Sequence, residues 1–169
     1  MLTDDINILS AADKFLFPGV GEAATTMEFL KKKKLDVFIK EVKQPLLGIC
    51  LGMQLMCSYS EEGDQECLGI FEVPALKFIP EKQQDKIPHI GWNTLTNLCS
   101  PLYHGLNEGD FVYFVHSYYV PVTNHTVAET DHILNFSASL QKDNFYAAQF
   151  HPEKSGTVGA RILDNFLSI

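Results

Sequence analysis

The sequence has few cysteines, and none of them is spaced for metal binding. Its four cysteines, Cys50, Cys57, Cys67 and Cys99, form no CxxC pair and no Cys/His cluster with zinc spacing. This absence excludes the common zinc-site patterns, and we expect neither a metal nor another cofactor. Because no secretory signal pattern is visible, we expect the cysteines to be reduced thiols.

Long apolar runs and an excess of basic charge are also lacking. No apolar run reaches the length of a membrane span, and the start, MLTDDINILS, lacks a basic region followed by an apolar one. We therefore expect a cytoplasmic protein that does not insert into a membrane. The net charge of −8 argues against nucleic acid as a general partner. The one basic run, Lys31 to Lys34, is interpreted as a solvated face near a helix end.

The chain has enough apolar sequence for one domain. It has 169 residues, of which 46% are hydrophobic, and no repeat or linker divides it. We therefore expect a single domain over residues 1–169.

The first part of the chain alternates between strand and helix patterns. Short apolar runs at Lys14–Phe17 and Leu46–Ile49 predict buried strands. The apolar spacing within 35–42 predicts one face of a helix that ends by Pro45, and Leu51–Tyr59 is predicted as a second helix. Strand, helix, strand and helix in this order favour a parallel sheet.

The middle of the chain is typical of strands, and its end is typical of a helix. Asp143-Asn144 predicts a hairpin turn, and 159–169 predicts a closing helix with Ile162 and Phe166 on its apolar face. The expected strands are FEVPALKFI, HIGWNTL, DFVYFVHSYYV, HTVAET, SASLQ and FYAAQF.

A cysteine stands between two glycines where the second strand meets the second helix. The stretch Gly48-Ile49-Cys50-Leu51-Gly52 has the G-x-C-x-G pattern of a nucleophile elbow, with sulfur in place of oxygen. Glycine is needed two residues to either side because side chains there would collide. At a helix N-terminus the pKa of the thiol should fall below about 8.5, and the Leu51 N–H points to where an oxyanion would form. The alternative is a small buried cysteine in a tight turn.

His151 is the candidate base for this nucleophile. It lies in QFHPEKSG after a strand pattern, and Glu153 follows two residues later. In extended backbone, residues i and i+2 face the same way, so the carboxylate could bind one imidazole nitrogen and leave the other for the thiol. A capped strand end with a surface glutamate remains an equal alternative.

A second glycine motif, PGVG at Pro18 to Gly21, also lies where a strand gives way to a helix. Loops at the carboxyl ends of parallel strands share one edge of the sheet, so this loop and the Cys50 elbow could face each other. Such a loop could aim backbone N–H groups at an anion, although many ordinary turns also contain Pro-Gly.

Five stretches occur in one order: FPGVGEA, GICLGMQLM, IPHIGWN, YFVHSYYV and QFHPEKSG. From about Ala12 to the C-terminus they resemble the class I (triad) glutamine amidotransferases. GICLGMQ alone marks only the wider class, whereas PGVG, HIGWN and HPEKS together are specific to the branch that serves histidine biosynthesis. The resemblance implies a three-layer, flavodoxin-like α/β fold, with helices on both faces of a mixed sheet.

The resemblance also implies an activity, the hydrolysis of L-glutamine to glutamate and ammonia. Cys50 would attack the carboxamide, His151 would take the thiol proton and donate it to the departing ammonia, and Glu153 would orient His151. Leu51 and the PGVG loop, at Val20 or Gly21, would hold the oxyanion. The residues implied in binding the amino-acid end of glutamine are Gln54, His116, Ser117 and Tyr118.

A protein partner is implied as well. In this branch, ammonia passes to a (β/α)₈-barrel synthase subunit of the HisF type, which makes imidazole glycerol phosphate and AICAR, and Trp92 and Lys154 match positions facing that subunit. From the residues alone, a tryptophan placed like Trp92 is more often packed in the core than exposed, and His116 is typical of a satisfied core histidine. Tyr118 and its neighbour Tyr119 alternate along a strand, so one could be core and one surface.

Other functions remain open. They are an amidotransferase serving another acceptor pathway, a non-catalytic homologue and a cysteine peptidase. The presence of Cys50, His151 and Glu153 together argues against the non-catalytic homologue, and Gln54 argues against the peptidase.

Family members begin with a strand, a Tyr-Gly-x-Gly-Asn loop and a helix before the region that matches Leu2 onward. This sequence contains none of them, so we expect additional sequence before Met1 or a truncated product with impaired folding. Without these elements, the strand of Phe15 should lie at a sheet edge or pair with another molecule, because the preceding strands are missing.

Overall fold

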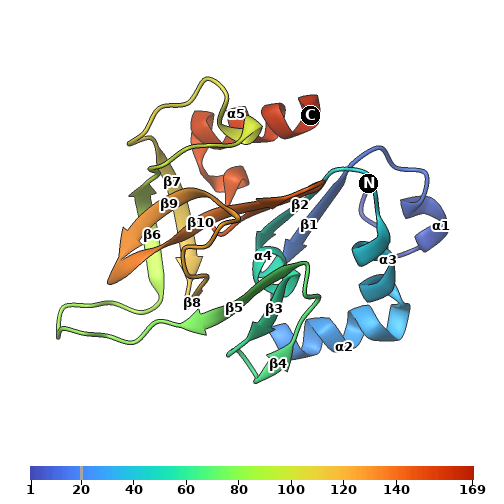
Figure 1. Cartoon of the computed structure of the whole chain (residues 1–169), viewed down its shortest axis with the longest axis horizontal. Helices are drawn as coiled ribbons and strands as arrows, with labels where there is room; N and C mark the ends of the chain where they lie inside the picture. The colour runs from blue at the N-terminus through green and yellow to red at the C-terminus, as the bar shows by residue number, and fades with distance from the viewer. Residues whose placement is uncertain (20) are drawn as a thin grey trace.

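The computed structural model describes residues 1–19 and 21–169, and a five-stranded mixed sheet lies at its centre (Figure 1). Its strands have the order β1-β2-β11-β10-β9, in which β2 is parallel to both neighbours and β9, β10 and β11 are antiparallel. Their bounds are β1 Phe15–Gly19, β2 Leu46–Cys50, β9 Thr126–His132, β10 Leu134–Lys142 and β11 Phe145–Ala148. The helices are α1 Ile6–Leu9, α2 Ala23–Lys33, α3 Leu35–Glu41, α4 Leu51–Met56 and α5 Gly156–Ser168.

Each face of this sheet carries its own hydrophobic core, because alternate side chains of a strand point to opposite faces. Leu46 and Ala147 pack in the cluster that includes the buried residues of α2, α3 and α4. Leu47 and Ala148, one residue further along their strands, pack with the buried face of α5. In Figure 1, α5 lies on one side of the sheet and α1, α2 and α3 lie on the other. The structure therefore confirms the predicted α/β fold with helices on both faces.

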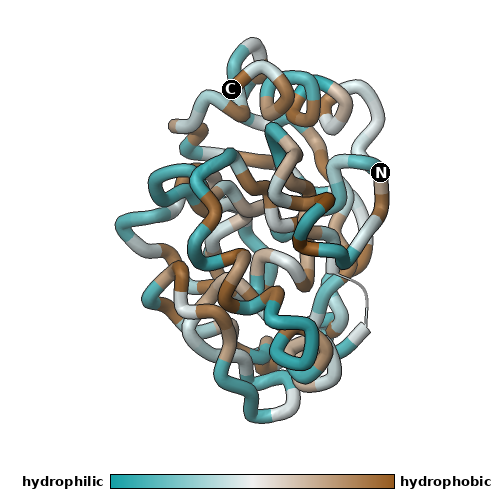
Figure 2. Tube along the Cα trace, turned by 90° about the vertical axis from the view of Figure 1, so that its right-hand side faces the viewer, coloured by the Kyte–Doolittle hydropathy of each residue, from teal (hydrophilic) through white to brown (hydrophobic). Residues whose placement is uncertain are grey.

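The middle of the chain forms two smaller sheets beside the central one. The first has the order β4-β3-β5-β8, and the second pairs β6 with β7. Along the trace coloured by hydropathy, the outer turns are largely hydrophilic and the hydrophobic segments run inside (Figure 2). The bounds are β3 Cys57–Ser60, β4 Gln65–Glu66, β5 Phe71–Lys77, β6 His89–Thr94, β7 Phe111–His116 and β8 Tyr118–Tyr119.

Most of the predicted elements are present, but the second predicted helix is too long. The helix α4 ends at Met56, and residues 57–60 form β3 in place of the predicted continuation to Tyr59. Cys57 leaves the helix with extended backbone angles, and β3 pairs with β5 and β4. This sheet pairing outweighs the local helical pattern, which is a common outcome for short segments. The Asp143-Asn144 hairpin turn is confirmed, because Lys142 pairs with Phe145.

The strand β1 lies at the edge of the central sheet, as predicted for the strand of Phe15. It pairs only with β2, and the Phe15 N–H donates to the Pro45 carbonyl at 2.9 Å. Leu16 on this edge strand is half exposed.

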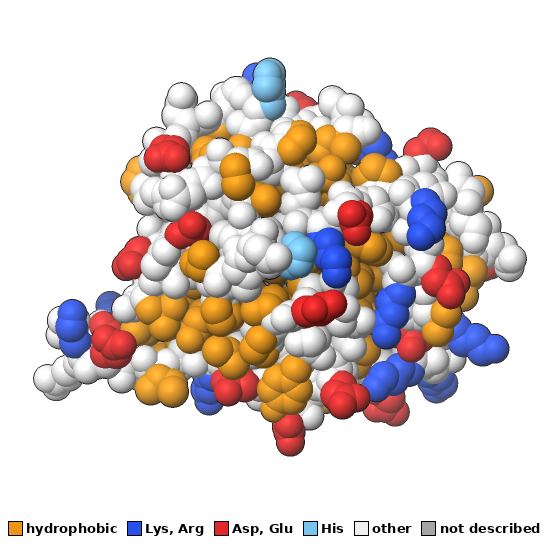
Figure 3. Space-filling model, viewed as in Figure 1, with side chains coloured by type: hydrophobic (Ala, Val, Ile, Leu, Met, Phe, Trp, Pro, Cys, Tyr) orange, Lys and Arg blue, Asp and Glu red, His pale blue; other side chains and the backbone are white. Residues whose placement is uncertain are grey.

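On one face of the molecule, apolar side chains are exposed at the surface. In Figure 3 they gather over β5 and β8, whereas acidic and basic side chains are spread around the outline. Within the described part of the chain, no helix is both long and apolar enough to cross a membrane.

Candidate active site

Cys50 occupies the sharp junction predicted from its flanking glycines. It is the last residue of β2, and α4 begins at Leu51. Its backbone has φ 53° and ψ −110°, a conformation that costs energy for any residue with a side chain. This is the strained strand-to-helix turn of a nucleophile elbow, in which the side chain stands clear of both elements.

The two glycines beside Cys50 are required by close packing. A Cβ on Gly52 would overlap the carbonyl oxygen of Phe17 in β1, and a Cβ on Gly48 would come within 2.5 Å of the Met56 Sδ. The predicted need for glycine at both positions is thus confirmed. The atoms that would collide belong to the edge strand and to α4, so the elbow fits tightly between them.

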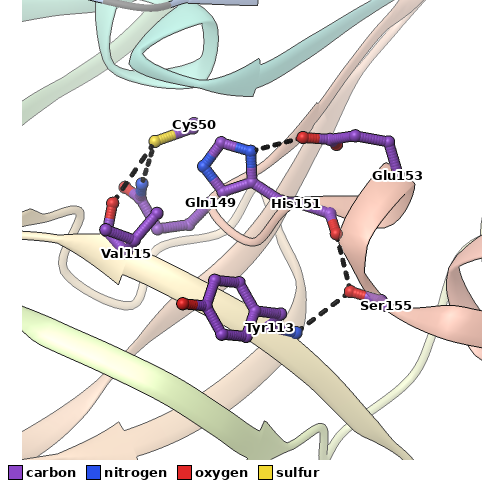
Figure 4. Close-up of polar contacts among 7 residues, drawn as sticks. All are labelled: Cys50, Tyr113, Val115, Gln149, His151, Glu153 and Ser155. Carbon is purple, nitrogen blue, oxygen red and sulfur yellow. Dashed lines mark hydrogen bonds and ion pairs between the residues drawn. The ribbon is translucent and has the colours of Figure 1, made fainter.

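The Cys50 thiol rests between two protein groups rather than in open solvent. The Sγ–H donates to the Val115 carbonyl at 3.8 Å, and the Gln149 Nε2 donates to Sγ at 3.7 Å (Figure 4). The pKa of the Cys50 thiol is raised to about 11, chiefly by burial and to a smaller extent by the charges of Glu153 and Glu62, while the Leu51 N–H and the charge of Lys154 act in the opposite direction. The prediction of a lowered pKa is therefore wrong for this structure, because desolvation outweighs the short helix α4.

His151 and Glu153 form the predicted pair. The His151 Nδ1 lies 2.7 Å from the Glu153 Oε1, and the imidazole is buried while the carboxylate is half exposed. Figure 4 shows the other ring nitrogen on the side that faces Cys50. That nitrogen, Nε2, is buried and has no hydrogen-bond partner among the described residues. A buried imidazole nitrogen without a partner beside a cysteine is suited to exchange a proton with it.

The backbone of His151 is held by contacts that the sequence did not reveal. Its N–H donates to the Tyr113 carbonyl at 2.9 Å, and the buried Ser155 hydroxyl donates to the His151 carbonyl at 2.7 Å. The Tyr113 N–H in turn donates to the Ser155 Oγ at 3.0 Å (Figure 4). This ring of hydrogen bonds fixes His151 to β7, so the imidazole is positioned before a substrate arrives.

The first half of the predicted PGVG loop belongs to β1, which extends to Gly19, and this end of the strand lies beside the elbow as the sheet argument predicted. Gly19 pairs directly with Cys50 in the parallel register of β1 and β2. Gly21 has φ 112°, which favours glycine, and both glycines line the same pocket as Cys50. Val20, the other residue expected to hold the oxyanion, lies outside the described residues. The oxyanion roles of Gly21 and Leu51 remain predictions.

A cavity of about 410 Å³ opens over the cysteine, a size that suits a small-molecule ligand. Every residue that the sequence nominated for glutamine binding lines it, and Lys154 lies there too. Glu62 is a lining residue that sequence reasoning missed, and it is the only carboxylate among the described lining residues. The lining residues are Gly19, Gly21, Cys50, Leu51, Gln54, Glu62, Pro88, Val115, His116, Ser117, Tyr118, His151 and Lys154.

The structure shows whether His116 and Trp92 are core residues, a question that the sequence left open. His116 is buried and both of its ring nitrogens have partners in the protein, the Tyr118 carbonyl and His89, as expected for a satisfied core histidine. Trp92 is 55% exposed on β6, with its ring 5.9 Å from that of Tyr113. The core interpretation of Trp92 is therefore wrong, because its side chain stands on the outer face of the β6–β7 pair.

Comparison with known proteins agrees with this geometry. The family described as "Glutamine amidotransferase class-I" matches residues 3–169. The chain is 60% identical, over all of its length and 86% of the relative's, to "Imidazole glycerol phosphate synthase subunit HisH" of Bacteroides fragilis strain YCH46. It is 42% identical over 184 aligned residues to the protein of that name from Colwellia psychrerythraea, with 99% of this chain and 81% of the relative covered.

Solved structures support the fold. A putative GMP synthase protein from Thermoplasma acidophilum matches with a TM-score of 0.72 at 20% identity, covering 98% of this chain and 77% of that one. A structure described as a glutamine amidotransferase gives the same TM-score at 17% identity, covering 98% and 83%. Taken with the elbow, the His151–Glu153 pair and the match over residues 3–169, these similarities lead to one conclusion: the chain belongs to the class I glutamine amidotransferase family.

Proposed function

We propose that residues 1–169 act as a single glutaminase domain that hydrolyses L-glutamine and supplies the ammonia to a synthase subunit in histidine biosynthesis. The observation that carries the proposal is the juxtaposition of a strained cysteine elbow with a buried His–Glu pair in one small pocket. The sequence similarity to proteins named imidazole glycerol phosphate synthase subunit HisH supports the choice of pathway.

The chemistry follows from the positions of three side chains. The His151 Nε2 takes the Cys50 proton, and the sulfur attacks the carboxamide carbon of glutamine to form a tetrahedral intermediate. His151 returns the proton to the nitrogen, the C–N bond breaks, and ammonia leaves a glutamyl thioester on Cys50. Water, deprotonated by His151, then attacks the thioester, and glutamate departs as the thiol is restored. Glu153 keeps Nδ1 protonated and stabilises the imidazolium that forms in each half-reaction.

The raised pKa of Cys50 fits this order of events. A thiol with a pKa of about 11 is protonated at neutral pH, so it needs the adjacent base when glutamine is in place. The oxyanion that forms is assigned to the N–H group of Leu51 and to that of Val20 or Gly21.

Glu62 is proposed to bind the α-ammonium group of glutamine. Its Oε2 accepts from the Ala23 N–H at 2.9 Å, which holds the carboxylate at the pocket wall. Burial raises the pKa of Glu62, which is the expected cost of placing an acid where it meets a ligand cation. Gln54 donates to the Tyr118 carbonyl and to Gln149, so its carbonyl oxygen is the atom left for the same end of the ligand.

Replacing Glu62 with glutamine should raise the KM for glutamine about tenfold and leave kcat within a few-fold, because an ion pair with the ligand is lost away from the reacting atoms. Steady-state hydrolysis measured over a wide glutamine range checks this. Glu61→Gln serves as a control, since Glu61 is not among the lining residues. An unchanged KM in Glu62→Gln would remove Glu62 from the binding site.

The synthase partner is proposed to be a HisF-type (β/α)₈ barrel that docks on the outer face of β6 and near Lys154. Ile90, Trp92 and Phe111 are each more than half exposed on the β6–β7 pair, which gives this face an apolar patch. Lys154 lies in the short helical turn after His151 and lines the pocket, so a partner that contacts it would sit beside the site of ammonia release. Tryptophan is a frequent anchor in protein interfaces.

Trp92→Ala and Lys154→Ala should weaken partner binding or nucleotide-dependent activation, with little effect on thermal unfolding of the isolated chain. For Trp92 the loss expected of an interface anchor is about 2 kcal/mol, roughly thirtyfold in Kd. Titration calorimetry with the barrel partner, beside thermal melts, measures both quantities. Phe29→Ala is the matched control, because Phe29 is a similarly exposed aromatic on α2. A large loss of stability with unchanged partner affinity would contradict the interface role.

The overall proposal is tested by glutaminase assays with and without the barrel partner and its nucleotide substrate. Glutamate release that rises when the partner and nucleotide are added supports it. Activity only with a different acceptor enzyme would favour another pathway, peptide cleavage would favour a peptidase, and no hydrolysis under any condition would favour a non-catalytic homologue.

A further inference from the structure

One buried side chain contacts the Cys50 sulfur but has no part in the chemistry described above. Gln149 follows β11 directly, and its Nε2 lies 3.7 Å from the Cys50 Sγ. The parallel pairing of Ala148 with Ile49 brings the next residues of the two strands, Gln149 and Cys50, side by side. Gln149 is fully buried, so water does not compete for its amide.

The direction of the Gln149 amide is set by a carbonyl that can only accept. The Gln54 Nε2 donates to the Tyr118 carbonyl at 3.3 Å and to the Gln149 Oε1 at 3.0 Å. A carbonyl oxygen can only accept a hydrogen bond. The Gln54 amide must therefore turn its NH₂ group, and not its oxygen, toward the Tyr118 carbonyl. The same nitrogen then requires an acceptor on Gln149, which turns the Gln149 NH₂ group toward the sulfur.

Two buried histidines support the Tyr118 carbonyl, His116 by direct contact and His89 through His116. The His116 Nδ1–H donates to it at 2.7 Å, and the His116 Nε2 is therefore the acceptor for the His89 Nδ1–H at 3.1 Å. Burial lowers the pKa of His89 to about 4 and that of His116 to about 3, so both rings stay neutral and keep these tautomers at ordinary pH. The support for the Gln149 amide thus extends from β6 to the cysteine.

We propose that Gln149 is a positioning residue for Cys50, whose amide donates a hydrogen bond that holds the sulfur and stabilises its thiolate during glutamine hydrolysis. The inference rests on the proposed glutaminase function for its kinetic consequence, but the contact itself does not. In the resting state Cys50 donates to Val115, and the Gln149 amide already points at the sulfur. Once His151 has removed the proton, the bond becomes charge-assisted and stronger.

Two variants separate this role from a merely structural one. Gln149→Glu keeps an acceptor oxygen for Gln54 and the side-chain length, but once its carboxyl is ionised, which burial shifts to higher pH, it has no donor for the sulfur. Gln149→Met removes both contacts at similar volume. Gln141→Glu is the matched control, because Gln141 lies on β10, accepts from the Ser100 hydroxyl and is absent from the pocket lining.

The test measures alkylation of Cys50 by iodoacetamide from pH 7 to pH 10.5, with mass spectrometry that assigns the modified residue by its fragment ions and the exposed Cys99 as an internal reference. Both Gln149 variants should slow Cys50 alkylation at a given pH about tenfold relative to Cys99 and shift its profile to higher pH, as expected for losing a hydrogen bond to a charged group. Both should also lower kcat for glutamine by a similar factor with little change in KM.

Gln149→Glu with an alkylation profile like that of the parent chain and of Gln141→Glu would overturn the proposal, even if Gln149→Met were inactive or unfolded. A raised KM with unchanged kcat in Gln149→Glu would also overturn it, since Gln149 would then act on the substrate through Gln54. Alkylation needs no glutamine, so a failure of the proposed function leaves this readout intact. Such a failure would show separately, as absent hydrolysis in the parent chain.

Discussion

Cys50→Ala is expected to abolish glutamine hydrolysis, while the complex with the synthase partner continues to use free ammonia. The cysteine supplies the only sulfur nucleophile among the described residues of the pocket, and the proposed partner would consume ammonia at a site of its own. Loss of a nucleophile commonly removes several orders of magnitude in kcat, so a fall of about 10⁴-fold or more is predicted. Glutamate release and ammonia-dependent synthesis are measured on the same preparation.

The matched control for this substitution is Cys99→Ala, which removes an exposed thiol far along the chain and should leave both activities unchanged. Glutamine-dependent synthesis that survives in Cys50→Ala, or that falls only twofold, would mean that the nucleophile has been assigned wrongly. Loss of the ammonia-dependent reaction as well would point instead to damaged partner docking.

His151→Asn is expected to lower kcat for glutamine by about 10²–10⁴-fold, the usual contribution of a general acid–base. The effect should be large because the thiol has a raised pKa of about 11 and needs a base to ionise at neutral pH. Asparagine preserves polarity and is small enough to fit, so folding should be retained. Ammonia-dependent synthesis should again be unaffected.

His104→Asn provides the comparison for His151→Asn, because His104 is exposed and does not line the pocket. Hydrolysis should be normal in this control. A His151 variant that keeps more than about one tenth of the parent kcat would contradict the assignment of His151 as the base, given the magnitude expected for such groups.

The parts of the site that could be predicted from sequence are those set by local chemistry. The elbow at Cys50 was predictable because its glycines mark a turn that no other residue fits, and the structure places the Phe17 carbonyl and the Met56 sulfur against them. The His151–Glu153 contact was predicted as one of two alternatives, but the extended backbone assumed for it was wrong, because Glu153 lies in the short 3-10 helix Pro152–Lys154. Each of these patterns lies within five consecutive residues of the sequence.

The features that sequence reasoning missed depend on how distant segments meet. The helix after Cys50 stops at Met56 because residues 57–60 pair with β5, a partner more than ten residues away. Gln149 lies beside Cys50 only through the register of β11 and β2. The pKa of Cys50 rises because the whole fold buries it. None of these follows from the stretch in which the residue stands.

The most direct test of the account is to find which atom of the protein attacks the carboxamide. A glutamine analogue that carries a diazoketone in place of the carboxamide should alkylate the attacking nucleophile when the chain is mixed with its synthase partner. Mass spectrometry with fragment-ion assignment of the modified residue is predicted to find one adduct, on Cys50 itself, with excess glutamine preventing it and the other three cysteines unmodified. An adduct on Cys57, Cys67 or Cys99, or full loss of glutaminase activity without any change at Cys50, would contradict the account.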